Sequence, residues 1–243
     1  MVVGAASGLG AAAARSFSDQ GARLVLVDRN AEDLQVVRSE LGLNHLAVSG
    51  DATDPDTAGR ANAAFVEPVD VLFVAAGIDP LGATNVLGTS LADWRMVIDV
   101  NVTASFIFAK EVLPSMLERG KGSMVFTASI SGIKPTPSEA AYSVSKAALI
   151  QLTRSIALDY AGKGIRANCI CPGYLEQVMQ DRLGEMSAQD LAARSAAASS
   201  AVPMGREGSY SEIAEIVLFL SDASRASYIT GQAVVADGGV LLA

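Results

Sequence analysis

The sequence predicts a single α/β domain in which helices cover both faces of a doubly wound parallel sheet. Short runs that are almost entirely apolar alternate with segments of helical periodicity from one end of the chain to the other. Such runs are typical of strands buried on both faces, and their alternation with helices is typical of a parallel sheet with crossover connections. The chain has 243 residues, of which 50% are hydrophobic, and no repeat or Pro-rich linker divides it. Residues 1–243 therefore form one predicted domain.

Each predicted element follows from its own pattern of apolar residues. In chain order, the elements are a shortened first strand that includes Val3, helix 9–19, a strand ending at Asp28, helix 31–41, a strand ending at Asp51, helix 53–66, a strand ending at Gly77, helix 91–118, a strand ending at Ser129, helix 140–161, a strand ending at Gly173, helix 211–220 and a strand ending at Gly239. The longest connection, residues 174–209, leaves the sheet at the carboxyl ends of its strands, where open parallel sheets bind their ligands. We expect this connection to form a substrate loop.

The composition argues against several classes of partner and site. The formal net charge is -8, so the chain has no positive field for nucleic acid or for an anionic membrane surface. Apolar runs such as residues 69–77 are far shorter than the roughly 20 residues of a membrane-spanning helix. No signal-peptide pattern follows Met1, so we expect a cytoplasmic location. His45 is the only histidine, and Cys169 and Cys171 are the only cysteines, which favours neither a metal site nor a Ser-His-Asp triad.

Tyr142 and Lys146 lie four residues apart in a helical pattern, so their side chains share one face of the helix. Both residues are also common at the wet surface of a helix, which is the plain alternative interpretation. A phenol accepts a proton near neutral pH only when its anion is stabilised, and a nearby ammonium together with a second positive charge would do this. The pair therefore raises the question of where a second positive charge would come from.

A glycine-rich segment near the start of the chain suggests an answer. Gly4, Gly8 and Gly10 stand between an apolar strand and a helix, where backbone N–H groups approach the pyrophosphate of a dinucleotide. The second strand then ends in Asp28, where such folds place the carboxylate that binds the adenosine ribose, although an ordinary turn aspartate is the alternative. A carboxylate there repels the 2′-phosphate of NADP, so we expect NAD, with Arg29 as the residue that would instead favour a phosphate. Oxidised nicotinamide carries the second positive charge.

Taken together, these residues resemble the short-chain dehydrogenase/reductase family, whose single-domain members have a Rossmann fold. The resemblance covers essentially the whole chain and rests on motifs in a fixed order. The motifs are GAASGLG at 4–10, Asp28, GDATD at 50–54, AAG at 75–77, DVNVTASF at 99–106, SMVFTASISG at 123–132, the spacing of Tyr142 and Lys146, CPG at 171–173 and YITGQAVVADGG at 228–239.

The resemblance implies an NAD-dependent oxidoreductase that interconverts a small-molecule secondary alcohol and a ketone, without a metal. Tyr142 would be the general acid/base, Lys146 would bind the nicotinamide ribose and lower the pKa of Tyr142, and Ser129 would bind the substrate oxygen. Asn101 would bend its helix and help to carry a proton-conducting chain of water. Taken singly, Ser129 could be a turn residue, Asn101 a partner for backbone groups and Lys146 part of a solvated face.

The resemblance also implies which residues contact the cofactor and the substrate. The cofactor residues would be Gly4, Ser7, Gly8, Leu9, Gly10, Asp28, Arg29, Asp51, Ala52, Ala76, Gly77, Val100, Tyr142, Lys146, Pro172, Gly173 and Leu175. The expected lining of the substrate pocket comprises Ile130, Ser131, Lys134, Thr136, Ser138, Tyr174 and the segment 177–206. This mixed polar and apolar lining suggests a small or medium hydroxylated substrate, such as a polyol, a sugar or a cyclic alcohol.

The chain departs from the family pattern in three places. Val3 stands where relatives usually have threonine, Val74 and Ala75 replace a pair of asparagines, and Gln177 stands where threonine is expected. We expect these changes and the short first strand to weaken the sheet and cofactor binding, and to leave the proton-transfer residues intact.

Two other functions and one mode of assembly follow from the same residues. An NADPH-dependent ketone or 3-oxoacyl reductase is the nearest alternative, and Asp28 argues against it. A non-catalytic Rossmann protein that senses NAD is the second alternative, and the set of Asn101, Ser129, Tyr142 and Lys146 argues against it. The resemblance also implies a homo-oligomer, a tetramer or dimer, joined through the helices that contain Asn101 and Tyr142.

Overall fold

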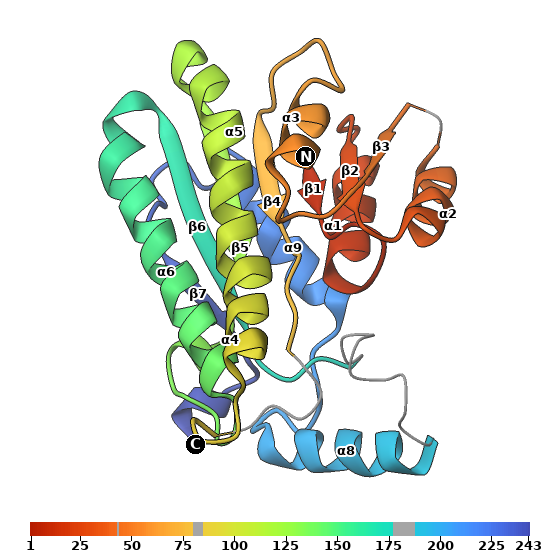
Figure 1. Cartoon of the computed structure of the whole chain (residues 1–243), viewed down its shortest axis with the longest axis vertical. Coiled ribbons are helices and arrows are strands. Elements are labelled where there is room, and N and C mark those ends of the chain that lie inside the picture. Colours follow the sequence, from red (N-terminus) through yellow and green to blue (C-terminus); the bar gives the residue numbers. More distant parts are fainter. Residues whose placement is uncertain (43, 80–84, 177–187) are drawn as a thin grey trace.

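A computed structural model of the chain describes residues 1–42, 44–79, 85–176 and 188–243, with side chains placed outside 188–194. Within these ranges, seven parallel strands form one sheet in the order β3-β2-β1-β4-β5-β6-β7, with helices on both faces (Figure 1). The strands are β1 Val2–Val3, β2 Val25–Asp28, β3 Leu46–Ser49, β4 Val71–Val74, β5 Gly122–Thr127, β6 Ile165–Pro172 and β7 Ala233–Ala236. The helices are α1 Gly8–Asp19, α2 Ala31–Leu41, α3 Pro55–Asn62, α4 Leu91–Ile98, α5 Ala104–Arg119, α6 Ala140–Tyr160, α8 Ala188–Ala201 and α9 Tyr210–Ser221. The predicted doubly wound parallel sheet in a single domain is confirmed.

The first strand is as short as the sequence predicts, and it still holds the centre of the sheet. Its two residues pair with β2 on one side, where Val2 lies opposite Leu26, and with β4 on the other, where Val2 lies opposite Phe73. The order of the strands reverses at β1, because the chain moves outward to β2 and β3 and then returns to β4. Crevices at such a reversal are where doubly wound sheets bind ligands.

The sheet separates two apolar layers, because successive strand residues point to opposite faces. Val2, Leu26 and Phe73 pack with α1, α2 and α9 on one face. Val3 and Val27, each one residue further along its strand, pack with α3, α5 and α6 on the other face. Figure 1 shows α5 and α6 in front of the sheet and α9 behind it. Burial on both faces explains why the strands contain almost no polar residues.

Helix α3 is shorter than the predicted helix 53–66. It begins at Pro55, because the side chain of Asp54 accepts a hydrogen bond from the backbone N–H of Asp56 and so caps the helix. It ends at Asn62. Proline suits the first helical position because its missing N–H would have no partner there.

The predicted helix 91–118 is a continuous helical segment that contains an irregular turn. Asp99–Thr103 is π-helical and joins α4 to α5. A π-helical turn bends the axis and commonly marks a functional site. This turn contains Asn101, the residue that was expected, from the family resemblance, to bend its helix.

Helix α8 was not predicted, because the sequence of this segment reads as a low-complexity run of Ala and Ser without an apolar stripe. It lies below the sheet in Figure 1, within the predicted substrate loop.

Among the helices of the described ranges, none has the length and the apolar character that crossing a bilayer requires.

Candidate active site

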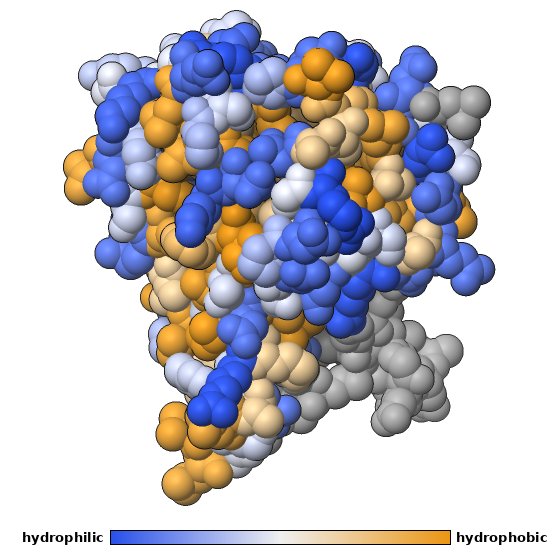
Figure 2. Space-filling model, turned by 45° about the horizontal axis from the view of Figure 1, so that its top comes forward, coloured by the Kyte–Doolittle hydropathy of each residue, from blue (hydrophilic) through white to orange (hydrophobic). Residues whose placement is uncertain are grey.

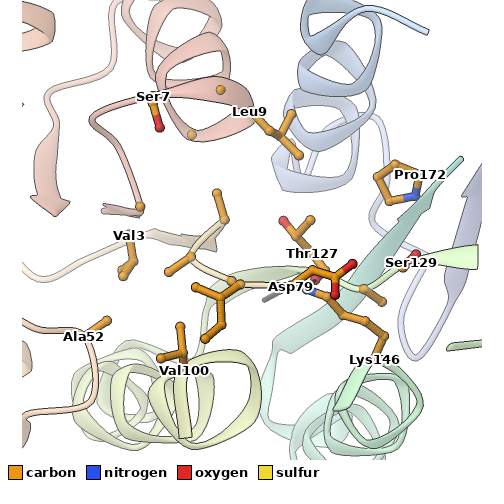
Figure 3. Close-up of a pocket in the computed structure, with 18 of the residues that line it drawn as sticks. Val3, Ser7, Leu9, Ala52, Asp79, Val100, Thr127, Ser129, Lys146 and Pro172 are labelled. Carbon is orange, nitrogen blue, oxygen red and sulfur yellow. Dashed lines mark hydrogen bonds between the residues drawn. The ribbon is translucent and has the colours of Figure 1, made fainter. Parts of the chain in front are cut away.

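A cleft with a volume of about 510 Å³ lies at the carboxyl ends of the central strands. This volume is in the range of small-molecule and cofactor sites. Every residue predicted to contact the cofactor, from Gly4 to Leu175, lines this one cleft, and so does Ser129. Figure 3 shows Ser7 and Leu9, from the start of α1, on one side of the cleft and Lys146, from α6, on another. The structure therefore brings together residues that are far apart in the sequence.

The segment between β1 and α1 forms a turn that only small residues permit. Gly4 has a φ of +82, and a Cβ atom on it would lie 2.6 Å from the backbone nitrogen of Ala76. A Cβ atom on Gly10 would lie 1.8 Å from the carbonyl oxygen of Gly4. The N-cap residue of α1, Ser7, makes no side-chain hydrogen bond to the helix. The first amides of α1 thus remain available at the cleft, and a helix terminus of this kind suits the pyrophosphate of a dinucleotide.

The carboxylate of Asp28 is held at the end of β2 by two backbone groups. One of its oxygens accepts a hydrogen bond from Ala6 N–H at 3.0 Å, and the other accepts one from Asn30 N–H at 3.0 Å. Arg29, beside it, is exposed and lines the same cleft. Asp51 lies nearby at the end of the next strand, and hydrogen bonds from the backbone and side chain of Thr53 lower its pKa. The rim that would receive an adenosine ribose thus carries fixed negative charge.

Three side chains meet at the other end of the cleft. Ser129 follows β5 and begins a short 3-10 helix, and its side chain accepts a hydrogen bond from Ser131 N–H at 3.1 Å. Tyr142 and Lys146 come from the first two turns of α6. This helix packs closely against the 3-10 turn, since a Cβ atom on Gly132 would lie 2.7 Å from the carbonyl carbon of Lys146. The close approach places the hydroxyl of Ser129 near Tyr142, where it lowers the pKa of the phenol.

The ammonium of Lys146 lies beneath the tyrosine and is almost fully buried. Lys146 is 3% exposed, and its Nζ donates a hydrogen bond to the carbonyl oxygen of Thr127 at 2.8 Å. Nζ also lies 5.4 Å from the centre of the Tyr142 ring. Burial lowers the pKa of Lys146 to about 8, so the group stays mostly protonated at pH 7.

In the protein by itself the pKa of Tyr142 is raised, and Lys146 is not among the groups that shift it, so a lowering by Lys146 together with bound nicotinamide stays a prediction. Burial raises the pKa of Tyr142 to about 12; the hydrogen bond from Ser129 lowers it, and the negative charge of Glu139 raises it further. The physical reason is that Nζ points to Thr127 and lies over the ring face, while the phenol oxygen has lost its water. The stabilisation of a phenolate therefore has to come largely from a bound positive charge.

Asn101 joins the active-site helix to the strand edge. It is 0% exposed; its Oδ1 accepts a hydrogen bond from Ile78 N–H at 2.7 Å, and its Nδ2 donates to Ile78 O and to Ser145 Oγ, each at 2.9 Å. These bonds hold the segment after β4, where the family's asparagines are missing. Backbone bonds from Ala75 and Ala76 to Val3 O do the same at the strand edge.

The predicted substrate lining is only partly brought together. Ile130, Ser131, Thr136 and Tyr174 line the cleft. Lys134 and Ser138 were also expected there, but they are exposed and absent from the lining among the described residues, although Thr136 between them lines the cleft. The departure at Gln177 and the segment 177–187 lie outside the described residues.

Asp79, Tyr210 and Glu139 are among the cleft residues that the sequence analysis did not name. Asp79 is 3% exposed and lines the cleft near Lys146 (Figure 3). Tyr210, at the start of α9, lies 3.4 Å from the position of a Cβ atom on Gly8, and no local pattern indicates this contact. Glu139 precedes Tyr142 by one helical turn, and that spacing was a usable signal.

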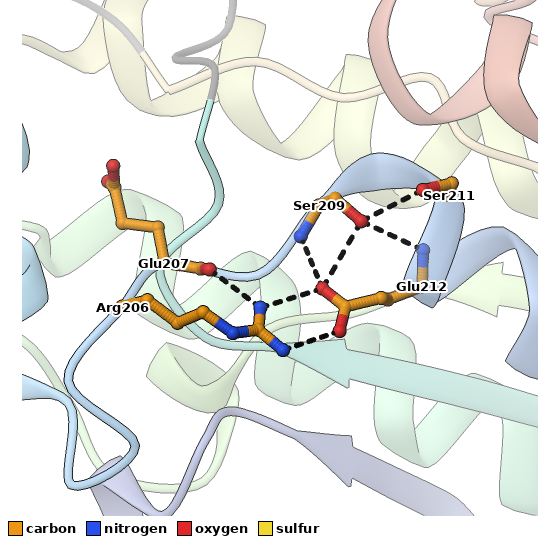
Figure 4. A network of polar contacts seen from close by, with 5 residues as sticks. All are labelled: Arg206, Glu207, Ser209, Ser211 and Glu212. Atoms are coloured by element: carbon orange, nitrogen blue, oxygen red, sulfur yellow. Dashed lines mark hydrogen bonds and ion pairs between the residues drawn. The ribbon is translucent and has the colours of Figure 1, made fainter.

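The two ends of the predicted substrate loop are fixed to each other. Glu176 N–H donates to Gly208 O and Gly208 N–H donates to Tyr174 O, each at 2.9 Å. Arg206 then forms a two-pronged ion pair with Glu212, the residue that caps the start of α9 together with Ser209 (Figure 4). The guanidinium of Arg206 and the backbone N–H of Ser209 lower the pKa of Glu212 to about 2. Backbone hydrogen bonds and this ion pair thus hold the two ends of the loop together beside the cleft.

Known proteins resemble this chain over nearly its whole length. The family model described as enoyl-(acyl carrier protein) reductase matches residues 4–241. A galactitol 2-dehydrogenase (L-tagatose-forming) of Cereibacter sphaeroides is 38% identical over 98% of this chain and 92% of its own. A protein of Xanthobacter autotrophicus named inactive 2-(S)-hydroxypropyl-CoM dehydrogenase 2 is 34% identical over 93% of this chain and 98% of its own. The structure of a 3-oxoacyl-[acyl-carrier protein] reductase of Brucella melitensis with bound NAD superposes with a TM-score of 0.86 and 29% identity. The match covers 99% of this chain and 90% of the reductase.

Proposed function

The chain belongs to the short-chain dehydrogenase/reductase family, and on this premise we propose that it is an NAD-dependent oxidoreductase that interconverts a secondary alcohol and a ketone. One observation carries the proposal. Ser129, Tyr142 and Lys146 meet at one end of a cleft whose other end holds the glycine-rich turn and Asp28. A dinucleotide that spans this cleft would bring its reactive ring to the three side chains.

Each side chain has a separate role in the proposed reaction. A bound nicotinamide would accept hydride from the carbinol carbon, or donate it to the carbonyl carbon. Ser129 holds the substrate oxygen through a hydrogen bond, and Tyr142 removes the hydroxyl proton during oxidation and returns it during reduction. Lys146 places a buried positive charge under the tyrosine and would hold the nicotinamide ribose. Asn101 fixes the segment after β4 and positions the start of α5.

The preference for NAD over NADP follows from Asp28. Its oxygens are fixed by backbone N–H groups, so the carboxylate stays at the position expected for the ribose hydroxyls. A 2′-phosphate would meet this charge and that of Asp51 nearby. Arg29 offers the one opposing charge at this rim among the described residues, and it is exposed.

A small hydroxylated substrate is the proposed class. The galactitol dehydrogenase supports it as the relative with the highest identity among those named above. The 3-oxoacyl reductase supports a second candidate, reduction of a 3-oxoacyl substrate, and Asp28 argues against NADPH in that role. The relative named as inactive supports a third, a protein that binds NAD without turnover. Residues 174–209 form the proposed substrate loop.

We further propose a homo-oligomer that assembles through α4, α5 and α6. Large apolar side chains on these helices reach the surface; Leu91, Trp94, Met96, Phe106 and Val144 are all at least one third exposed. Figure 2 shows hydrophobic atoms among hydrophilic ones on the side of the molecule that α5 and α6 cover. Burial of these side chains against a second copy would remove them from water. A cytoplasmic location stays a prediction of the sequence.

The proposal is tested by following absorbance at the NADH band with purified protein. Alcohols are offered with NAD or NADP, and ketones with NADH or NADPH. We expect reduction of NAD by at least one hydroxylated secondary alcohol, with kcat/KM at least about tenfold higher than with NADP, which corresponds to about 1.4 kcal/mol. Turnover of a 3-oxoacyl thioester with NADPH alone contradicts the proposal. Tight binding of NAD without turnover of any alcohol supports the sensing alternative.

A further inference from the structure

Glu139 lines the substrate end of the cleft, although it stands where a residue would normally cap a helix. It is the N-cap residue of α6, and its side chain makes no hydrogen bond to the first amides of that helix. The carboxylate instead accepts a hydrogen bond from Ser131 Oγ at 3.4 Å, and Ser131 Oγ also lies 2.9 Å from Thr136 Oγ1. A capping function therefore does not explain the residue.

These polar groups adjoin the position of the reacting oxygen. The backbone of Ser131 donates a hydrogen bond to the side chain of Ser129. The hydroxyl of Ser129 in turn lowers the pKa of Tyr142. The charge of Glu139 acts directly on Tyr142 and raises its pKa. The carboxylate thus lies within electrostatic range of the phenol that would touch the carbinol, on the side of the cleft that the substrate occupies in the proposed function.

The backbone before Glu139 is strained in a way that fixes its direction. Ser138 has a φ of 61, the only positive φ of a non-glycine residue within the described ranges. A left-handed conformation of this kind costs about 1 kcal/mol or more, and it persists where the surrounding structure demands it, often at functional sites. Burial also raises the pKa of Glu139, so keeping its charge in the cleft has a cost. Strain and desolvation together argue against an incidental surface carboxylate.

The groups present select one kind of ligand chemistry. A partly desolvated carboxylate flanked by the hydroxyl groups of Ser131 and Thr136 accepts hydrogen bonds from O–H donors and repels anions. The other charged groups that line this end of the cleft in the described ranges are Lys146 and Asp79, and the thiols of Cys169 and Cys171 lie behind Lys146 on β6. An anionic substituent at this end of the cleft would therefore face the carboxylates of Glu139 and Asp79 as well as the ammonium of Lys146.

We propose that Glu139 is a specificity-determining residue that accepts a hydrogen bond from a second hydroxyl group of the substrate, so that the enzyme selects neutral polyols over single alcohols and over hydroxy acids. The inference rests on the proposed function and names its substrate class. Glu139 is the acceptor, and Ser131 and Thr136, which are hydrogen-bonded to each other and to Glu139, complete the polar wall beside it. A substrate with a second hydroxyl replaces the water at this carboxylate by a hydrogen bond, whereas a substrate without one removes the water and gives nothing in return.

The test uses three series of compounds with three to six carbons, namely polyols, secondary alcohols with one hydroxyl and aldonates, with the wild-type protein and NAD. Glu139→Leu is expected to reduce the preference for polyols over single alcohols by at least about tenfold, as for loss of a hydrogen bond to a charged group. Glu139→Gln, which keeps the shape, retains more of that preference and raises kcat/KM for aldonates by about tenfold, because it removes the repulsion. Asp159→Asn, the same charge change on an exposed residue at the far end of α6, leaves all three ratios unchanged.

A second readout separates the charge of Glu139 from any structural role. In Glu139→Gln the pKa that governs alcohol oxidation falls, because a negative charge near Tyr142 is gone. A uniform loss on all three series, with an unmoved pH profile, would show that Glu139 only supports the loop and would overturn the inference. Oxidation of single alcohols but of no polyol would overturn it as well.

The failure of the proposed function has a different signature. If NAD binds and no compound is oxidised, the proposed function is refuted, and polyol binding to the protein saturated with NADH then decides the inference. Calorimetric titration of a polyol should show binding that weakens by about tenfold in Glu139→Leu. Equal binding in the two proteins, or no binding in either, contradicts the role of Glu139.

Discussion

Binding of the oxidised cofactor is predicted to lower the pKa of Tyr142, and binding of the reduced cofactor is not. In the protein by itself, burial and Glu139 hold that pKa near 12. The oxidised nicotinamide ring is positive, whereas the reduced ring is neutral. The two forms of the cofactor therefore differ at the active site mainly by one charge, which makes them a matched pair of probes.

The size of the effect follows from Coulomb's law. A unit charge at about 5 Å from the phenolate oxygen, at an effective dielectric constant of about 20, stabilises the anion by about 3 kcal/mol. Since about 1.4 kcal/mol corresponds to a change of 1 in pKa, the pKa of Tyr142 falls from about 12 to roughly 10. Alcohol oxidation needs the phenolate, so its kcat/KM rises as the pH rises through this value. Ketone reduction needs the phenol, so it proceeds at neutral pH.

The assay is an ultraviolet titration of tyrosinate, made with saturating NAD and again with saturating NADH. The chain has five tyrosines, so the signal of Tyr142 is taken as the difference between wild type and Tyr142→Phe. The pH dependence of kcat/KM for alcohol oxidation gives an independent value. An identical pKa in the two complexes, or oxidation rates that are flat between about pH 7 and pH 11, would refute the reasoning.

The remaining predictions concern stability. Below a pH of about 8 the buried charge of Lys146 destabilises the fold by about 3 kcal/mol, and this cost disappears as the pH rises to about 10.5. Lys146→Met should therefore raise the melting temperature at pH 7, although activity is lost. A lower melting temperature in this variant would contradict the burial argument. In Gly10→Ala the new Cβ atom would lie 1.8 Å from a carbonyl oxygen, so this variant should lose NAD binding and be destabilised by several kcal/mol. In the control Gly59→Ala the new Cβ atom in α3 meets nothing within 4 Å, so denaturant titrations should show stabilisation by up to about 1 kcal/mol. Asn101→Ala should cost about 2–4 kcal/mol, because it leaves both backbone groups of Ile78 without their partner, and a cost below about 1 kcal/mol would count against these bonds.

Residue spacing explains why much of the cleft could be predicted. The glycines of the first turn, Asp28 at the end of β2 and the pair of Tyr142 and Lys146 each form a local pattern with a geometric meaning. The rule that parallel strands present their carboxyl ends at one edge then places these patterns together. The shortened first strand was also predictable, because the sequence offers only a brief apolar run before Gly4.

Properties that depend on burial and on distant contacts could not be predicted. The direction of the Tyr142 pKa depends on lost hydration and on where Lys146 Nζ points, and neither is a property of spacing. The contact of Tyr210 with the glycine-rich turn joins segments about two hundred residues apart, and the sequence carries no sign of it. Helix α8 was missed because its many alanines favour a helix without producing an apolar stripe, and its serines are common in loops.

The central claim is that the hydroxyl of Tyr142 transfers the proton, and the most direct measurement compares wild type and Tyr142→Phe. The variant removes one oxygen from a ring that lies in a formed cleft, so NAD affinity should stay within about threefold while kcat for alcohol oxidation falls by at least about a thousandfold. That pair of results is what the account predicts. A Phe variant that oxidises the same alcohol at a rate within about tenfold of wild type would contradict it.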